Sequence, residues 1–357
     1  MLSALVERGY SPVRLSDAPT RAYTMPDVRY ARKLSISGLW FFWRAGLVFT
    51  SHALYGGRAA VRGQRMVLLW HGEVVKPVGR FDGDRGIPAD VAPVCSPTGR
   101  AYRVAEFGLH PRQVPVVGAP RNDRLLSAVR RDVRERLGWA MDDVVWLWLP
   151  TYRTVVRGVG RPAGPDTPSG LPFSGDDLAA LDVLLVAENV QLVIKPHPLA
   201  QQAIGGRYRN IRVLPQSVVE EEGNSLYEIL AASDGLVTDV SSVWLDYLLL
   251  QRPIVFAFPD IEEYRLRRGL NLEPYEDWAA GPIVADVDAF ARALARLRGS
   301  ADPYAHRREA MLKRFHSHVD ANSAERLLDW LGLSGPRRAG GMRWSGTSPS
   351  SNSSGSP

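Results

Sequence analysis

The sequence predicts an α/β protein with two domains, each built on a parallel β-sheet. At about 150 residues per domain, the 357 residues indicate two domains, each large enough to bury a core. Short apolar runs alternate with helix-favouring segments, an order typical of βαβ units and parallel sheets. The residues that can carry chemistry follow three of these runs directly, and parallel sheets bind ligands beyond the carboxyl ends of their strands.

The N-terminal half is expected to hold a helix at 31–45 and a strand at 47–50, followed by a strand at 66–70. Glycine-rich connections separate them from a strand at 92–96, a helix at 97–107 and a strand at 114–118. A turn is expected at 119–123, and the helix that follows it, 123–137, leads into the second half.

In the C-terminal half, continuous apolar runs predict buried strands and the segments between them predict helices. The expected strands are 144–149, 191–194, 211–214, 235–238 and 253–258, and the expected helices are 176–188, 225–232, 241–250, 286–298 and 303–331. Residues 155–174 are rich in glycine and proline, which predicts a long loop.

Three segments follow from this order. Residues 1–137 are expected to form an N-terminal Rossmann-like domain, and residues 138–333 a C-terminal one. The last helices of the second domain are expected either to stay with it or to pack back on the first domain. Residues 334–357 consist mainly of Gly, Ser, Pro and Arg, with too few apolar side chains to form a core, and are expected to be disordered.

The only cysteine is Cys95, so neither an internal disulfide nor a cysteine zinc site is expected, which favours a reducing, cytoplasmic compartment. No signal peptide is expected, because the N-terminus lacks a basic segment followed by a long apolar run.

The apolar stretch at 38–49 is shorter than the roughly 20 residues of a membrane span. It is either a helix leading into a core strand or, since it holds tryptophans and Arg44, a peripheral membrane contact.

The net charge of +6 is concentrated at the N-terminus, where residues 1–65 hold ten Lys and Arg residues against three acidic ones. This region is expected either to attract anionic partners, such as phosphate polymers, nucleic acid or an anionic membrane surface at the inner face of the cell membrane, or to be an arginine-rich solvated surface. Signatures of nucleic-acid binding are absent from the sequence, so no nucleic-acid partner is expected.

The first chemical motif is Trp70-His71-Gly72, with Lys76 shortly after it. The expected strand delivers His71 into a loop whose glycine lets a ligand approach the backbone closely. An imidazole suits a general base at neutral pH, although a single loop histidine is also a common incidental residue.

The second motif is Lys195-Pro-His197-Pro, after the strand at 191–194. The two prolines fix the backbone around His197, and Lys195 adds a positive charge.

The third motif is Thr238-Asp239-Val-Ser241-Ser242, between a strand and a helix. Its hydroxyls and the helix N-terminus favour an anion site, although Asp and Ser are also ordinary helix caps.

Together these motifs suit the transfer of a group from a diphosphate. No cluster has metal-ligand spacing, and neither a GxGxxG nor a Walker A loop is present. No metal and no cofactor are therefore expected.

In their order along the chain, five segments resemble the CDP-glycerol glycerophosphotransferases of teichoic acid synthesis, which include priming and polymerising enzymes. They are the motifs at 70–76 and 194–198, together with Gly118-Ala-Pro-Arg-Asn-Asp123, Pro150-Thr-Tyr-Arg153 and the segment 238–247. The resemblance covers about residues 31–269 and implies a GT-B-like fold, in which two Rossmann-like domains face each other across a cleft.

The resemblance further implies transfer of glycerol phosphate from CDP-glycerol, or of another polyol phosphate from a related CDP-polyol, with release of CMP. The acceptor would be a hydroxyl of a polyprenyl-diphosphate-linked saccharide or of a polyol-phosphate chain. The shortness of the chain favours a priming enzyme. A GT-B glycosyltransferase that uses a nucleotide sugar is the main alternative.

On this resemblance His71 is the general base on the acceptor hydroxyl, and His197 faces it across the cleft and holds or protonates the diphosphate. The other residues implied on the donor side are Arg153, Lys195, Thr238, Asp239, Ser241, Ser242 and Arg268, and those on the acceptor side are Gly72 and Lys76. Asp239 either accepts a hydrogen bond from glycerol or holds His197. Glu73 departs from the small polar residue common in the family, which leaves the identity of the acceptor open.

Overall fold

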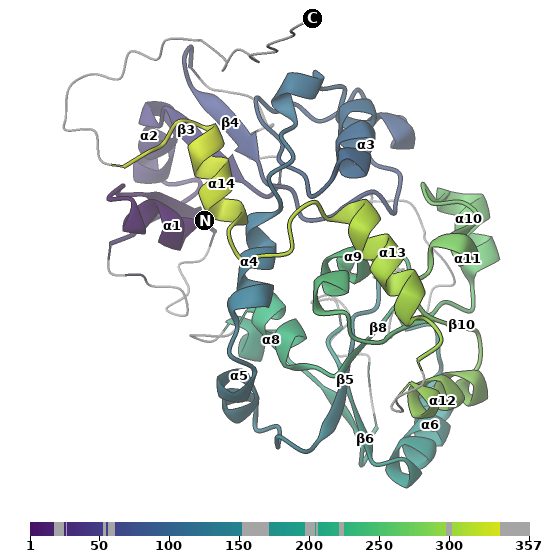
Figure 1. Cartoon of the computed structure of the whole chain (residues 1–357). Coiled ribbons are helices and arrows are strands. Elements are labelled where there is room, and N and C mark those ends of the chain that lie inside the picture. Colours follow the sequence, from purple (N-terminus) through teal and green to yellow (C-terminus); the bar gives the residue numbers. More distant parts are fainter. Residues whose placement is uncertain are drawn as a thin grey trace, which may run out of the picture.

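A computed structural model describes residues 1–17, 25, 27–52, 55, 61–151, 171–196, 204, 206–220, 225–297 and 302–335. Within these ranges the chain is an α/β protein with parallel strands in both halves (Figure 1). His197, Arg153, most of the loop expected at 155–174 and nearly all of the tail expected at 334–357 lie outside the described residues.

The N-terminal half is built around the parallel pair β3 and β4, to which isolated parallel bridges add two further segments, Val67 to Val91 and Val94 to Val116. Its elements are α1 (Leu2–Glu7), β1 (Val13–Ser16), β2 (Arg29–Arg32), α2 (Ile36–Arg44), β3 (Leu47–Thr50), β4 (Arg65–Leu68), α3 (Pro97–Phe107), α4 (Pro120–Ser127) and α5 (Arg130–Leu137).

Several expectations for this half are wrong in detail, among them the single helix expected at 123–137, which is divided between α4 and α5. The strands expected at 92–96 and 114–118 are single bridges, because Pro93 and Pro115 cannot donate a ladder hydrogen bond. The turn expected at 119–123 is the start of α4, with Pro120 at the first helical position, which suits proline. The helix expected at 31–45 begins only at Ile36, where the Ser35 side chain accepts a hydrogen bond from the Gly38 N–H at 3.0 Å.

The C-terminal half contains a six-stranded parallel sheet in the order β10-β9-β8-β5-β6-β7. Its elements are β5 (Val144–Trp148), α6 (Gly175–Ala187), β6 (Val190–Ile194), β7 (Ile211–Val213), α7 (Gln216–Glu220), α8 (Leu226–Ala232), β8 (Gly235–Thr238), α9 (Val243–Tyr247), η5 (Leu248–Leu250), β9 (Ile254–Ala257), α10 (Ile261–Arg268), α11 (Tyr275–Trp278), β10 (Ile283–Val284), α12 (Val287–Arg296), α13 (Ala305–Phe315) and α14 (Ser323–Trp330).

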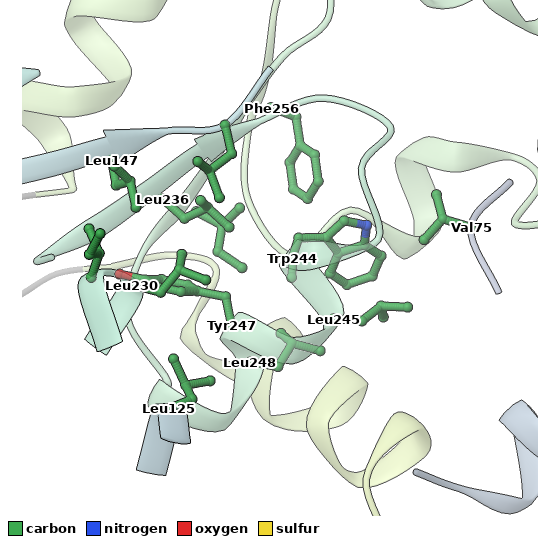
Figure 2. Packing of buried hydrophobic residues seen from close by; sticks show 14 of the residues in the cluster. Val75, Leu125, Leu147, Leu230, Leu236, Trp244, Leu245, Tyr247, Leu248 and Phe256 are labelled. Atoms are coloured by element: carbon green, nitrogen blue, oxygen red, sulfur yellow. The ribbon is translucent and has the colours of Figure 1, made fainter. Parts of the chain in front are cut away.

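Both faces of this sheet are buried, because successive side chains of a strand point to opposite faces. On β5, Leu147 packs into the cluster that includes Trp244 and Phe256, which Figure 2 shows from close by. Its neighbours Trp146 and Trp148 face the second cluster, which α6 and α12 cover. A sheet buried on both faces reads as continuous apolar runs, and this is why its strands were visible in the sequence.

The chain runs from β5 outward through β6 to β7, then returns to the other side of β5 with β8 and continues outward through β9 to β10. The order therefore reverses between β5 and β8. In an open α/β sheet, a crevice for ligands forms beyond the carboxyl ends of the strands at such a switch point. The segments that follow β5 and β8 accordingly define where a ligand site is expected.

The single helix expected at 303–331 is two helices. Between α13 and α14 the chain turns, because the Ser317 N–H donates to the Cys95 carbonyl at 2.9 Å and the Asp123 carboxylate accepts from the Ser323 and Ala324 N–H groups, both at 2.8 Å. The last helix, α14, thereby lies against α1 and α4 in the N-terminal half of the molecule (Figure 1).

Candidate functional site

The turn after β4 carries His71 and is held in a costly conformation. Trp70 has a φ of 54°, in the left-handed region that a bulky residue rarely adopts. Its ring packs edge-on against Phe107, with centroids 5.0 Å apart, and under the Arg103 guanidinium. Arg103 Nη2 also donates to the Gly72 carbonyl at 2.9 Å. Strain that several contacts maintain is a mark of functional sites.

Two neighbours of the His71 ring fix its orientation. Nδ1 lies 3.2 Å from the Ser51 carbonyl oxygen, and because a carbonyl only accepts, this contact places the proton on Nδ1 and the lone pair on Nε2. The His52 ring stacks on the His71 ring with centroids 4.4 Å apart and planes within 12°. Ser51 and His52 directly follow β3, so the two parallel strands bring these segments together.

The protonation of His71 suits a general base. Although the residue is accessible to solvent, its ring packs between His52 and Trp70, and this desolvation lowers the pKa of His71 below its ordinary value of 6.5. The nearby cations Arg121 and Lys76 lower the pKa further. A neutral imidazole with an available Nε2 can take a proton from a hydroxyl near neutral pH.

Across from this turn, Thr238 and Asp239 end β8 at the switch point, and both are buried. The Thr238 hydroxyl donates to the Leu149 carbonyl at 3.0 Å. The Asp239 carboxylate accepts from the Thr151 hydroxyl at 2.6 Å and from the Thr151 N–H at 3.0 Å. These two residues therefore join the segments that follow β5 and β8, and they shape the loop that precedes α9.

Ser241 and Ser242 lie beyond them and are partly exposed at the start of α9. Ser242 is the residue that precedes the helix, yet its side chain makes no capping hydrogen bond. A β-carbon built on Gly72 would lie 2.8 Å from the Ser242 hydroxyl oxygen. The structure thus brings Gly72, an expected acceptor-side residue, directly against the expected donor-side serines.

The cationic candidates are spread around this contact. Lys195 is the first residue after β6, the strand that pairs with β5 in the sheet, and it is partly buried. Lys76 follows the His71 turn, and its carbonyl accepts from Asn271 Nδ2 at 3.1 Å. Arg268 ends α10, and the Gly269 that follows would place a β-carbon 3.7 Å from Pro77.

Sequence reasoning missed Ser51, His52 and Thr151 as site residues. Each lies within three residues of the end of a parallel strand, and that position was the one available signal for them. Among the residues that the structure describes, no group of three or more His, Cys, Asp or Glu side chains is arranged to hold a metal ion. None of the helices in the described ranges combines the length and apolar character needed to cross a bilayer.

Two α/β halves with parallel strands, which meet where Gly72 of the first lies close to Ser242 of the second, are typical of a GT-B-like architecture. The sequence model of the CDP-Glycerol:Poly(glycerophosphate) glycerophosphotransferase family matches residues 7–332. The chain belongs to this family, as its ordered motifs indicated.

Several curated proteins are similar to it. It is 28% identical over 244 residues to a teichoic acid ribitol-phosphate primase of Bacillus spizizenii, an alignment that covers 68% of this chain and 59% of the relative. It is 26% identical over 294 residues to a teichoic acid poly(glycerol phosphate) polymerase of the same species, covering 75% of this chain and 70% of that protein. A ribitol-phosphate polymerase of Staphylococcus aureus, TarL, is 25% identical over 283 residues, which cover 75% of this chain but 47% of TarL. The chain thus matches about half to two thirds of the length of these relatives.

The fold is also that of a solved structure, the wall teichoic acid polymerase TagF. It superposes with a TM-score of 0.74 at 21% identity over 92% of this chain and 84% of that chain. A histidine-to-asparagine variant of TagF that was soaked with CDPG gives the same TM-score of 0.74 at 20% identity. At this identity the likeness establishes the GT-B-like fold of the chain.

Proposed function

We propose that this chain transfers glycerol phosphate, or a similar polyol phosphate, from CDP-glycerol or a related CDP-polyol to a hydroxyl of a lipid-linked saccharide or polyol-phosphate chain. CMP is released, and the product belongs to a teichoic acid-like cell-wall polymer. The observation that carries the proposal is the close approach of Gly72, the neighbour of His71, to Ser242 at the start of α9, with the His71 ring held by Ser51 and His52. The primases and polymerases among the relatives support it.

In the proposed reaction, His71 Nε2 accepts the proton of the acceptor hydroxyl as its oxygen attacks the β-phosphorus of the donor. The bond from that phosphorus to the oxygen bridging the two phosphates breaks, and CMP leaves with that oxygen. The Ser241 and Ser242 hydroxyls and the start of α9 contact the diphosphate, while Thr238 and Asp239 act by shaping this loop. Positioning and charge stabilisation then account for most of the rate.

The remaining donor-side residues are proposed to neutralise the diphosphate. Lys195 and Arg268 are described in the structure, and Arg153 and His197 extend the same set beyond the described residues. His197 holds the diphosphate or protonates the leaving group, and Lys76 and Gly72 border the acceptor.

For the membrane side, we propose that α2 docks on an anionic bilayer at the inner face of the cell membrane. Gly38 and Phe42 are buried, whereas four apolar side chains of α2 are exposed, namely Ile36, Leu39, Trp40 and Trp43, of which Ile36 is 90% and Trp43 65% exposed; Leu34, just before the helix, is exposed as well. Arg44 lies over the Trp40 ring at 4.8 Å. Tryptophan beside arginine on an exposed apolar face suits the bilayer interface, and the basic N-terminal region suits anionic lipids.

The donor is tested by thermal shift with CDP-glycerol, CDP-ribitol and UDP-sugars, because a ligand that binds the folded state raises the melting temperature. We expect at least one CDP-polyol to raise it and to yield CMP once an acceptor is added. A shift with UDP-sugars alone would contradict the proposal and favour a GT-B glycosyltransferase.

A further inference from the structure

Glu73, which directly follows His71 and Gly72, turns away from the cleft into the protein. Its side chain is 7% exposed, with Oε2 3.7 Å from Arg103 Nη2 and Oε1 3.6 Å from Arg121 Nη2. Glu73 therefore pairs with two arginines, Arg103 and Arg121. Its departure from the small polar residue common in the family does not place a carboxylate at the acceptor.

Arg121 continues from Glu73 to the opposite half of the molecule. Its Nε and Nη2 donate to the two carboxylate oxygens of Asp246 at 2.8 and 3.0 Å. Asn122 Nδ2 and the Tyr227 hydroxyl donate to the same carboxylate at 3.0 and 2.8 Å. Asp246 is a buried residue of α9. The bidentate contact with Arg121 therefore joins α4 to α9, the helix that directly follows Ser242.

The four charged side chains form a buried chain in which the signs alternate, in the order Arg103, Glu73, Arg121 and Asp246. Burial alone would raise the pKa of Asp246, but the Arg121 guanidinium outweighs it and the pKa is lowered, so the carboxylate is charged. One end of this chain holds the Gly72 carbonyl through Arg103, and the other end lies within α9, just after Ser242. It therefore connects the His71 turn of the N-terminal half to α9 of the C-terminal half.

We propose that Glu73 and the Arg121–Asp246 pair are positioning residues that set the separation between the His71 turn and the start of α9. The catalytic part of this inference rests on the proposed function. A buried ion pair often stabilises a fold no better than a well-packed apolar pair, but its bidentate geometry fixes the relative placement of two elements. A displacement of about 1 Å in a reacting group can cost up to a hundredfold in rate.

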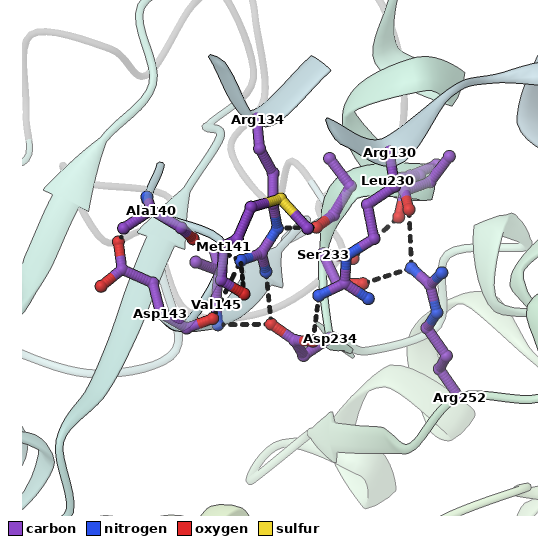
Figure 3. Close-up of polar contacts among 12 residues, drawn as sticks. Arg130, Arg134, Ala140, Met141, Asp143, Val145, Leu230, Ser233, Asp234 and Arg252 are labelled. Atoms are coloured by element: carbon purple, nitrogen blue, oxygen red, sulfur yellow. Dashed lines mark hydrogen bonds and ion pairs between the residues drawn. The ribbon is translucent and has the colours of Figure 1, made fainter. Parts of the chain in front are cut away.

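The first test compares Glu73→Gln and Asp246→Asn with a matched control. The control is Asp234→Asn, since Asp234 forms an ion pair with the fully buried Arg134 at 2.6 Å and accepts from the Val145 N–H at 2.9 Å (Figure 3). Asp234 precedes β8, at the end of the strand away from the site. We expect both test variants to lower kcat for CMP release about tenfold or more, with KM for the donor within about threefold. The control should lose stability but keep kcat. Equal kcat losses in all three variants would overturn the proposal.

The second test separates positioning from stability with the double variant Arg121→Met/Asp246→Leu, which replaces the ion pair by apolar side chains. We expect its melting temperature to exceed that of Asp246→Asn, because no buried charge is left unpaired, while kcat stays low. Recovery of kcat together with stability would show a structural role alone and overturn the proposal.

A third readout does not depend on the proposed reaction. Amide hydrogen exchange over residues 71–76 should be faster in Glu73→Gln and Asp246→Asn than in wild type and in Asp234→Asn. If wild type turns over no CDP-polyol, the proposed function fails while this comparison still decides the positioning role. Unchanged exchange in both test variants would refute that role.

Discussion

Gly72 of the N-terminal half lies so close to Ser242 of the C-terminal half that a β-carbon on Gly72 would be 2.8 Å from the Ser242 hydroxyl oxygen. The backbone of Gly72 is not in the left-handed region, so the close approach itself requires glycine at this position. The residue after the proposed base and the residue at the start of α9 are thus spaced by direct contact.

Replacing Gly72 by alanine should therefore impair turnover more than folding. The added methyl must move the Ser242 side chain or the His71 turn, and we expect kcat for CMP release to fall about tenfold or more. The free energy of unfolding should change by about 1 kcal/mol, because only the end of a side chain has to yield. Steady-state kinetics and urea unfolding measure the two effects.

A suitable control is Gly175→Ala, because a β-carbon there meets nothing within 4 Å. Removing the obstructing hydroxyl in Gly72→Ala/Ser242→Ala should restore the melting temperature. Wild-type kcat in the single Gly72→Ala variant would show that the contact is not critical.

His71→Ala should abolish CMP release while CDP-glycerol binding largely survives, because the imidazole acts on the acceptor side. Single-turnover CMP release and donor titration measure the two properties. His306→Ala, which removes an exposed histidine on α13, serves as the control and should behave as wild type. Near-normal turnover without His71 would rule it out as the base.

The pH dependence of the reaction tests the role of His52. Desolvation lowers the pKa of His71, so in wild type kcat/KM should fall on the acid side with an inflection below pH 6.5. His52→Ala removes the stacked ring and a neighbouring charge, and both changes raise the pKa of His71. The inflection should move to higher pH, and an unmoved acid limb would contradict this role.

Much of the fold was readable because the strands are continuous apolar runs buried on both faces. The strand expected at 235–238 matches the fully buried β8 residue for residue, and the strand expected at 47–50 matches β3, although only Val48 of β3 is buried. Some errors lie at local signals, such as Pro93 and Pro115 within the expected strands, and others where distant segments decide the local structure. The Asp123 carboxylate accepts from Ser323 and Ala324 at the start of α14, and the only local signal of this break is the run of turn and cap residues at 320–323.

The residues of the candidate site also differ in how far the sequence alone reveals them. His71, Gly72 and Ser242 stand out through their motifs, and the structure places the latter two in contact. His71 is oriented by Ser51 and His52, which belong to no recognisable motif. Only the pairing of β3 with β4 brings these two residues to His71. Side chains that act through such contacts become visible once the topology is known.

Glu106 makes the stability of the protein depend on pH. It is 3% exposed, and burial raises its pKa from 4.5 to about 7, although Arg103 and the hydrogen bond from Asn271 oppose the shift. The folded state therefore holds a proton that the unfolded state releases between these values. This stabilisation is complete below about pH 4.5 and is lost as the pH rises to about 7, by an amount of about 3 kcal/mol.

Glu106→Gln keeps an acceptor for Asn271 Nδ2, which lies 2.7 Å from Glu106 Oε1, and removes the titration. We expect the variant to be more stable than wild type above pH 7 and to lose much of the decline between pH 4.5 and 7. Urea unfolding across this range measures it, and parallel stability curves for the two proteins would be inconsistent with this assignment.

The exposed face of α2 should control binding to anionic vesicles. Trp40 and Trp43 are 53% and 65% exposed, and their indole rings can enter the interfacial region of a bilayer while Arg44 and the neighbouring cations meet the headgroups. Trp40→Ser/Trp43→Ser should lower the partition coefficient about tenfold, since the apolar area available for burial is lost. The residual binding should be strongly weakened by salt, because only the charge attraction remains.

The control for this experiment is Trp330→Ser, because Trp330 on α14 is also exposed, at 43%, but does not belong to the α2 face. Sedimentation with phosphatidylglycerol-containing vesicles should show wild-type binding for this variant. Since Trp40 and Trp43 are exposed, the double variant should keep the wild-type melting temperature, which separates lost membrane contact from misfolding. Equal sedimentation of wild type and the double variant would assign the membrane contact to another surface, whereas a loss confined to the α2 variant would support α2 as the membrane-facing element.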